Sequence, residues 1–593
     1  MKKIIGTILI LVLFHQMTFA QHIGKEWLKE HYTKTEVRIP MRDSISLYTS
    51  IYTPKQMNGK RPVIMHRTPY GCRPYGEEFR MLKEFRNYYL HDYIIVMQDV
   101  RGRFMSEGEF INMEERPEDT WDTVEWLLEN VPGNNGRVGL TGYSYPGYFA
   151  LMGALSRHPA IKAVAPQAPI SDWYKGDDIH HNGVLMLLDS YCFGRNFFRD
   201  CPNPTPSMPP VEDRIDKPVY DFFLEKRTFR NITATFPEPL AFWESLATHP
   251  DYDEYWEAKS AADDLTDIKA AVLVVGGSYD TDDCYGALHT YRSLKTLSPA
   301  APLHLVYGPW YHGGWRSEAT YLDNIEFPFF EHYLCDKPYE LPAVTVIPSR
   351  HSRGNQPEAV LRHQQQLQLG MKELPDTEKN AYTCYLSGKS QLSTRPPRKG
   401  HSKASRYTSD PAAPVPHFDQ PVRQKDKRYM IADQRFASKR KDVLSFAGSP
   451  LSDTLRLVGP AEVDLYVRSS TPDADFVVKV IDAAPDGHEM LVRWEVMRAR
   501  YREGFSRPVP MVPDQATRIR FRLPDIAHYF LPGHRLMIQI QSSFFPAIDL
   551  NPGIFLENIY EAEPDDFVPA EISILHSPEH PSRVVFNFIG TKD

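Results

Sequence analysis

The chain has 593 residues, of which 42% are hydrophobic and 24% are charged, and its formal net charge is -8. This length exceeds what a single hydrophobic core usually supports, so about two or three domains are expected. The sequence contains no basic stripe interleaved with aromatic residues, which argues against a protein that binds nucleic acid.

Residues 1–20 have the composition of a secretory signal peptide. Lys2 and Lys3 precede an apolar run, and Thr18 and Ala20 are small residues at the two positions that define a cleavage site. We expect cleavage after Ala20 and a periplasmic or secreted protein. Once the signal is removed no membrane partner is expected, because no later stretch reaches the roughly 18 apolar residues of a spanning helix.

Beyond the signal, predicted strands alternate with helices up to residue 170 and again from 268 to 340. The predicted elements are a hairpin at 35–52, strands at 62–65, 93–97, 137–141, 271–275 and 303–307, and a helix at 117–130. Such alternation is typical of a parallel sheet covered by helices on both faces. We therefore assign residues 21–170 and 268–340 to one α/β domain.

Two further regions lack this alternation. Residues 171–267 are rich in aromatic residues and prolines, with helical pieces at 220–226 and 239–246, and we expect a helical cap there. From 341 to 593, short β-like runs between turns predict an all-β jelly-roll domain. The clearest runs lie at 461–467, 476–480, 518–521 and 536–540, whereas 389–416 is expected to be a long surface loop.

Three polar residues each follow a predicted strand of the α/β domain. Ser144 follows 137–141, Asp280 follows 271–275 and His312 follows 303–307. Their order along the chain is that of α/β-hydrolases, and reactive groups collect at the carboxyl ends of parallel strands. We predict a nucleophilic hydrolase in which Ser144 attacks, His312 relays the proton and Asp280 orients the imidazole.

Each of these residues also has a structural interpretation. Gly142 and Gly147 flank Ser144 with one residue more than the usual elbow spacing, and a glycine-rich turn between a strand and a helix has the same composition. Asp280 alone could cap the helix that starts near Asp283. The coincidence of three such residues after three strands favours the catalytic interpretation.

No metal or cofactor is expected from the residue spacing. The six cysteines include no CxxC pair, and no zinc pattern is present. Asp280, Asp282 and Asp283 resemble a calcium loop, but Cys284 and Tyr285 stand where such a loop needs an oxygen ligand and a glycine.

The cysteines are too few to form a disulfide framework for a chain of this size. Cys192 and Cys201 flank a short segment. The sequence leaves open whether these two thiols pair in an oxidising compartment.

Several phrases of the sequence resemble the CocE/X-Pro dipeptidyl-peptidase class of serine hydrolases. They are the segment around Ser144, residues 101–108 and 308–314, and β-domain phrases that contain Asp442, Asp475, Gly533-His534-Arg535 and Asn551-Pro552. The resemblance runs from about residue 35 to the C-terminus. It implies an α/β-hydrolase domain with a helical cap insertion, a C-terminal jelly roll, and self-association into homo-oligomers.

Within this class the chain is most similar to the α-amino-acid ester hydrolases, which bind the substrate's ammonium group with three carboxylates. The resemblance implies that Asp178, Asp282 and Asp283 bind this group. It also implies that the phenol of Tyr70 and the backbone N–H of Tyr145 stabilise the oxyanion. Asp282 stands where the family usually has Glu, which shortens the reach of that carboxylate.

The substrate itself stays open at this point. Pro146 replaces the family's usual Glu in the elbow, and Ser349-Arg350-His351 lacks the Trp common at the start of the β domain. A small amino-acyl ester, amide or short peptide is expected. The alternative is an Xaa-Pro dipeptidyl-peptidase or a glutaryl-7-aminocephalosporanic-acid-type acylase on the same scaffold. A carbohydrate- or surface-binding protein on a relict hydrolase is a rival that the complete set of catalytic candidates disfavours.

Overall fold

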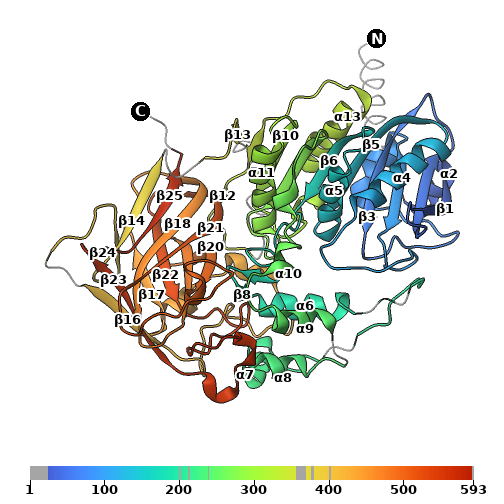
Figure 1. The fold of residues 1–593 in the computed structure, drawn as a ribbon. Coiled ribbons are helices and arrows are strands. Elements are labelled where there is room, and N and C mark those ends of the chain that lie inside the picture. The colour runs from blue at the N-terminus through green and yellow to red at the C-terminus, as the bar shows by residue number, and fades with distance from the viewer. Residues whose placement is uncertain are drawn as a thin grey trace, which may run out of the picture.

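A computed structural model describes residues 24–199, 201, 203–211, 214–237, 240–354, 369–375, 380–399 and 403–589. The predicted signal peptide, residues 1–20, lies outside the described residues. None of the described helices is long and apolar enough to cross a membrane. Figure 1 shows a sheet flanked by helices, a second region made of strands, and a group of short helices beside both.

Ten of the described strands form the first sheet, in the order β1-β2-β4-β3-β5-β6-β9-β10-β11-β13. Neighbouring strands from β4 to β11 pair in parallel. The strands are β1 (Tyr32–Pro40), β2 (Ser46–Pro54), β3 (Arg61–Thr68), β4 (Ile94–Asp99), β5 (Asn134–Tyr143), β6 (Ile161–Gln167), β9 (Ala271–Gly277), β10 (Leu303–Gly308), β11 (Val344–Val346) and β13 (Leu369–Met371).

Different helices cover the two faces of this sheet. In β3, Val63 and Met65 pack in one hydrophobic core and Ile64 packs in another, because side chains alternate along a strand. The helices over the first face are α4 (Pro117–Asn130), α5 (Tyr145–Leu155) and α11 (Cys284–Leu297). Those over the second face are α2 (Lys25–His31), α3 (Arg86–Leu90) and α13 (Phe327–Cys335). The predicted α/β architecture is confirmed.

The first sheet also continues beyond residue 340, which was the predicted end of the α/β domain. β11 pairs with β10, and β13 pairs antiparallel with β11. These strands are three residues long each, and so short a run carries no clear periodicity.

The chain between β6 and β9 forms the cap. Its elements are the hairpin β7 (His180–His181) and β8 (Val184–Leu185), and the helices α6 (Leu187–Phe197), α7 (Val219–Lys226), α8 (Phe229–Thr233), α9 (Ala241–Thr248) and α10 (Glu254–Glu257). The helical pieces predicted at 220–226 and 239–246 correspond to α7 and α9. Aromatic side chains fill its interior, among them Trp173, Tyr191 and Trp243.

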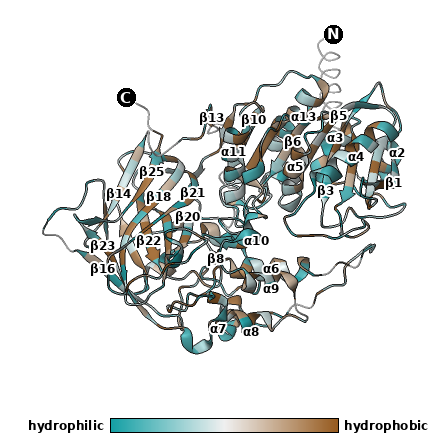
Figure 2. Cartoon of the chain, in the orientation of Figure 1, coloured by the Kyte–Doolittle hydropathy of each residue, from teal (hydrophilic) through white to brown (hydrophobic). Residues whose placement is uncertain are grey.

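The second sheet makes up the C-terminal all-β domain. Its strands are β12 (Ser349–Arg350), β14 (Ala381–Ser387), β15 (Gln391–Ser393), β16 (Ala404–Ser409), β17 (Leu444–Ala447), β18 (Leu455–Ser469), β19 (Asp475–Ala483), β20 (Glu489–Arg498), β21 (Thr517–Phe530), β22 (Arg535–Gln541), β23 (Ala570–Ser577), β24 (His580–Pro581) and β25 (Arg583–Phe588). Figure 2 shows hydrophobic residues gathered in the central strands of both sheets. The four strongest predicted runs fall within β18, β19, β21 and β22.

The surface loop predicted at 389–416 is wrong in part. β15 and β16 lie within it, and β16 pairs antiparallel with β23 along its whole length. Of its side chains, Tyr407 is buried while Arg406 and Thr408 are exposed. Such short alternation among prolines and basic residues gives a weak strand signal.

A hydrophobic cluster joins the β domain to the loops that follow β9 and β10. These loops contribute Tyr279 and Tyr311, which directly precede Asp280 and His312. Their β-domain partners in this cluster include Tyr429, Met490, Trp494, Phe544 and Ile548. The β domain therefore supports the backbone of two predicted catalytic residues.

Candidate active site

Ser144 stands at the sharp turn between β5 and α5. Its backbone has φ 63° and ψ -134°, a conformation that is rare outside glycine. A Cβ atom at Gly142 would lie 2.2 Å from the carbonyl oxygen of Pro146, and one at Gly147 would lie 2.5 Å from that of Gln167. Both glycines are therefore required for the tight turn that presents the serine hydroxyl.

His312 and Asp280 form a hydrogen-bonded pair at the ends of β10 and β9. The His312 Nδ1 atom lies 3.0 Å from both carboxylate oxygens of Asp280. Asp280 is almost fully buried, and its Oδ1 atom also accepts hydrogen bonds from the backbone N–H groups of Asp282 at 2.9 Å and Asp283 at 3.2 Å. This carboxylate therefore fixes both the imidazole and the loop that begins α11.

The acidic surroundings raise the basicity of the imidazole. Burial lowers the pKa of His312, but the Asp280 carboxylate, aided by Tyr143 and Asp178, outweighs burial and raises the pKa to about 9. An imidazole held in this way can accept a proton only after it has lost its own.

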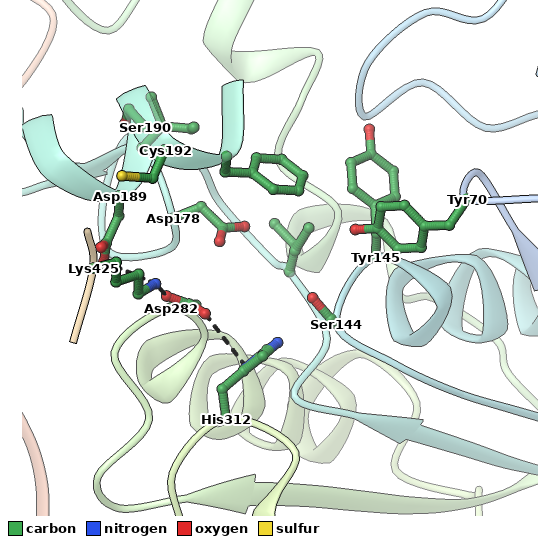
Figure 3. Close-up of a pocket in the computed structure, with 13 residues that line it drawn as sticks. Tyr70, Ser144, Tyr145, Asp178, Asp189, Ser190, Cys192, Asp282, His312 and Lys425 are labelled. Atoms are coloured by element: carbon green, nitrogen blue, oxygen red, sulfur yellow. Dashed lines mark hydrogen bonds and ion pairs between the residues drawn. The ribbon is translucent and has the colours of Figure 1, made fainter. Parts of the chain in front are cut away.

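Ser144 and His312 line one cavity of about 310 Å³. Figure 3 shows both side chains reaching into it from neighbouring turns. Among the described residues no hydrogen bond joins the two, and the hydrogen bond between a nucleophile and its base is often long until substrate binds. The cavity volume suits a small molecule.

Tyr70 and Tyr145, the residues predicted to supply the oxyanion donors, have their side chains on one side of Ser144 (Figure 3). Tyr70 lines the cavity and is 37% exposed, so its phenol is accessible to a ligand. The phenol of Tyr145 instead accepts a hydrogen bond from the backbone N–H of Met113 at 2.8 Å. Its backbone N–H is at the first position of α5, where N–H groups have no partner within the helix.

Asp177 and Asp178 are neighbours with different surroundings. Asp177 Oδ2 accepts hydrogen bonds from the backbone N–H groups of Ser171 at 2.8 Å and Asp172 at 2.9 Å, which fix the loop. Asp178 has a φ of 23° and lines the cavity, where its Oδ2 atom accepts a hydrogen bond from Trp173 Nε1 at 3.1 Å. The structure therefore brings Asp178 to Ser144.

Asp283 lies behind the cavity wall. It is fully buried, and neither of its carboxylate oxygens makes a hydrogen bond with any of the residues that the structure describes. Its Oδ2 atom lies 3.7 Å from His312 Nδ1. Burial, followed by the charges of Asp178 and Asp280, raises the pKa of Asp283 well above its usual range. Asp283 thus joins the acidic group, although the described residues that line the cavity include Asp178 and Asp282 and not Asp283.

Lys425 of the β domain extends into the same cavity, where Figure 3 shows it opposite the tyrosines. Its ammonium group pairs with Asp282 and, at 3.1 Å, with Asp189 of α6. Asp282 is therefore already paired with a cation from the chain itself. Lys425 and Asp189 could not be predicted from the sequence, because neither belongs to a motif and their contact joins segments that are far apart in the chain.

Asp280, Asp282 and His312 place ligand-type atoms within 4.8 Å of one another. Asp280 and His312 bond to each other, however, and Asp282 bonds to Lys425. A metal ion would have to displace the ammonium group of Lys425 from Asp282, so these residues do not fit a metal site. All six thiols are free, including those of Cys192 and Cys201.

Comparisons with known proteins agree with this geometry. Residues 43–314 match the family model of the X-Pro dipeptidyl-peptidase (S15 family), and residues 353–585 match that of the X-Pro dipeptidyl-peptidase C-terminal non-catalytic domain. The chain is 28% identical to a cocaine esterase of Rhodococcus sp. (strain MB1 Bresler), over 94% of this chain and 98% of that protein.

Two solved structures are similar over the same extent. An aminopeptidase from a marine sediment archaeon, Thaumarchaeota archaeon, is 31% identical with a TM-score of 0.85. An α-amino acid ester hydrolase is 30% identical, also with a TM-score of 0.85. Both alignments cover 94% of this chain and 97% of the other. The chain therefore belongs to the CocE/X-Pro dipeptidyl-peptidase class and is a serine hydrolase that acts on esters or peptides.

Proposed function

We propose that this enzyme hydrolyses esters, and some amides, of α-amino acyl groups through an acyl-enzyme on Ser144. In this proposal His312 takes the proton from Ser144 and gives it to the leaving group, and Asp280 holds the imidazole in the required tautomer. The phenol of Tyr70 and the backbone N–H of Tyr145 donate hydrogen bonds to the oxyanion.

The observation that carries the amino-acyl substrate is the crowding of acids beside the nucleophile, which keeps the pKa of Asp283 high until a further cation joins them. Asp178 lines the cavity, and Asp283 is buried next to it with neither oxygen hydrogen-bonded to a described residue. Buried carboxylates repel one another unless a cation lies between them. Lys425 already pairs with Asp282, so Asp178, backed by Asp283, is the acid left for a substrate ammonium group. The likeness to an α-amino acid ester hydrolase supports the same assignment.

The first test compares an amino-acyl ester with its des-amino analogue. A charge-assisted hydrogen bond contributes about 1.5–3 kcal/mol, so wild type should prefer the amino ester by roughly 10- to 150-fold in kcat/KM. In Asp178→Asn this preference should fall towards unity, and in Asp283→Asn it should fall less. Steady-state kinetics on both esters measures the ratio.

Two variants control this experiment. Ser144→Ala sets the background rate. Asp189→Asn also removes an acid from the cavity wall, but that acid pairs with Lys425, so the preference for the amino ester should remain. Equal turnover of both esters by wild type would defeat the ammonium-anchor proposal.

The rate should also depend on pH in a defined direction. His312, with a pKa of about 9, accepts a proton only when neutral, so kcat/KM should rise as the pH increases through about 9. Asp178→Asn removes a negative charge that stabilises the imidazolium, so the rise should move to lower pH. A pH profile with the des-amino ester measures this, because that substrate has no amine to titrate. An unchanged profile in Asp178→Asn would contradict the assigned coupling.

Lys425 should limit which acyl side chains fit. Lys425→Met removes the cation between Asp189 and Asp282, so a positively charged substrate side chain can take its place. We expect kcat/KM for a lysyl ester to rise about 10-fold, a gain of about 1.4 kcal/mol. A norleucyl ester has a neutral side chain of similar size and should change much less. A similar change for both esters would assign Lys425 a role in shaping the cavity instead.

A second candidate is cleavage of peptides from the N-terminus. It is supported by the likeness to an aminopeptidase, because the same acids would bind a peptide's terminal ammonium group. A panel of an amino-acyl ester, an Xaa-Pro amide and a glutaryl amide separates the options. We expect the ester to react fastest and the glutaryl amide slowest, since the acids in the cavity repel its carboxylate. Faster turnover of the Xaa-Pro amide would replace the ester proposal with the peptidase one.

A further inference from the structure

Imidazoles gather around one buried carboxylate in the β domain, away from the cavity of Ser144. The carboxylate is Asp482 of β19, whose side chain is fully buried. His534 Nδ1 lies 2.7 Å from its Oδ1 atom, and His528 Nε2 lies 3.0 Å from its Oδ2 atom. His351 Nδ1 lies 3.4 Å from Oδ2. The contact of His351 is longer than the other two and is not a hydrogen bond.

His351 presents a buried ring nitrogen, Nδ1, to the carboxylate of Asp482. Its side chain is 6% exposed, and within the described part of the chain Nδ1 makes no hydrogen bond, although it lies 3.4 Å from Asp482 Oδ2. The other ring nitrogen, Nε2, lies 3.0 Å from Nδ1 of His488. Where His351 donates its single proton to His488, its Nδ1 lone pair faces the carboxylate. Two lone pairs then face each other, an arrangement that a cation between them would stabilise.

The separation of one pair of these atoms matches metal coordination, whereas His534 Nδ1, 2.7 Å from Asp482 Oδ1, would have to release that hydrogen bond to bind an ion. Two ligand atoms that each lie about 2.1 Å from a tetrahedral Zn²⁺ are about 3.4 Å apart. That is the separation of His351 Nδ1 and Asp482 Oδ2. One ligand atom from each of His351, Asp482 and His534 lies within 4.8 Å of the others. We propose that these three residues bind a first-row transition-metal ion such as Zn²⁺, with water as the fourth ligand.

The surrounding contacts are those that orient metal ligands. Ligating histidines usually bond their second nitrogen to another group, as His351 bonds to His488. His528 bonds Asp482 on one side and the hydroxyl of Ser349 on the other, at 2.7 Å. The side chain of His534 is 10% exposed, which leaves a path for an ion to enter.

The position of the site assigns the ion a structural role. The chain first crosses from the first sheet to the second between β11 and β12, directly before His351, and returns to the first sheet at β13. Ser349 of β12 accepts a hydrogen bond from the phenol of Tyr279 at 2.8 Å, one residue before Asp280. The ion would therefore hold the crossing between the two domains next to the loop of the triad acid.

Metal binding is tested on the full-length protein after treatment with a chelator. We expect wild type to bind one equivalent of Zn²⁺ in calorimetric titration and Co²⁺ with the visible absorption of a four-coordinate site. Loss of an outer hydrogen-bond partner lowers metal affinity by about 10- to 100-fold, so His488→Gln should fall in that range and His351→Ala below it. Zn²⁺ should also raise the Tm of wild type and not that of His351→Ala.

Two controls locate the ion. Asp282→Asn alters the acidic group near Ser144 and should leave the affinity unchanged, as should His91→Gln, which changes an exposed histidine elsewhere. Wild-type binding requires no variant to fold, so absence of stoichiometric binding overturns the proposal by itself. Binding that survives in His351→Ala or is lost in Asp282→Asn would overturn it as well.

Discussion

The buried carboxylate of Asp280 is the contact on which the rest of the site depends. It holds the His312 imidazole through Nδ1 and accepts the backbone N–H groups of Asp282 and Asp283. One side chain thus sets both the position of the imidazole and the path of the chain into α11. Because that path places Asp282 and Asp283 beside His312, the position of the imidazole and the group of acids around it depend on the same bonds. A carboxylate with so many donors is held in one orientation.

The residues of the site that follow strand ends could be predicted from the sequence. Ser144, Asp280 and His312 each come after an apolar run, and strand ends meet at one edge of a parallel sheet. Gly142 and Gly147 beside Ser144 could also be predicted, because a Cβ atom at either position would collide with a backbone carbonyl oxygen of the tight turn. Asp178 needed the family resemblance in addition, since only contacts such as the Trp173 hydrogen bond distinguish it from Asp177.

The contacts that cross between domains could not be predicted in this way. Lys425 pairs with Asp189 and Asp282 across three regions of the chain, and no spacing rule links such residues. His351, Asp482 and His534 likewise come from separate segments, so their spacing in the sequence forms no zinc-binding pattern. β16 was not predicted because it is stabilised by pairing with β23, which is distant in sequence. Tertiary context decides all of these cases.

The reach of Lys425 into the cavity has a consequence for how such enzymes diversify. Ser144, Asp280 and His312 lie within the first 312 residues, whereas Lys425 lies in the region matched by the C-terminal non-catalytic domain. If Lys425 selects the acyl donor as proposed, recombination between homologous genes at the boundary would change that selection and leave these three residues unaltered. The name of that domain describes its lack of a nucleophile, and not a lack of influence on what the nucleophile meets.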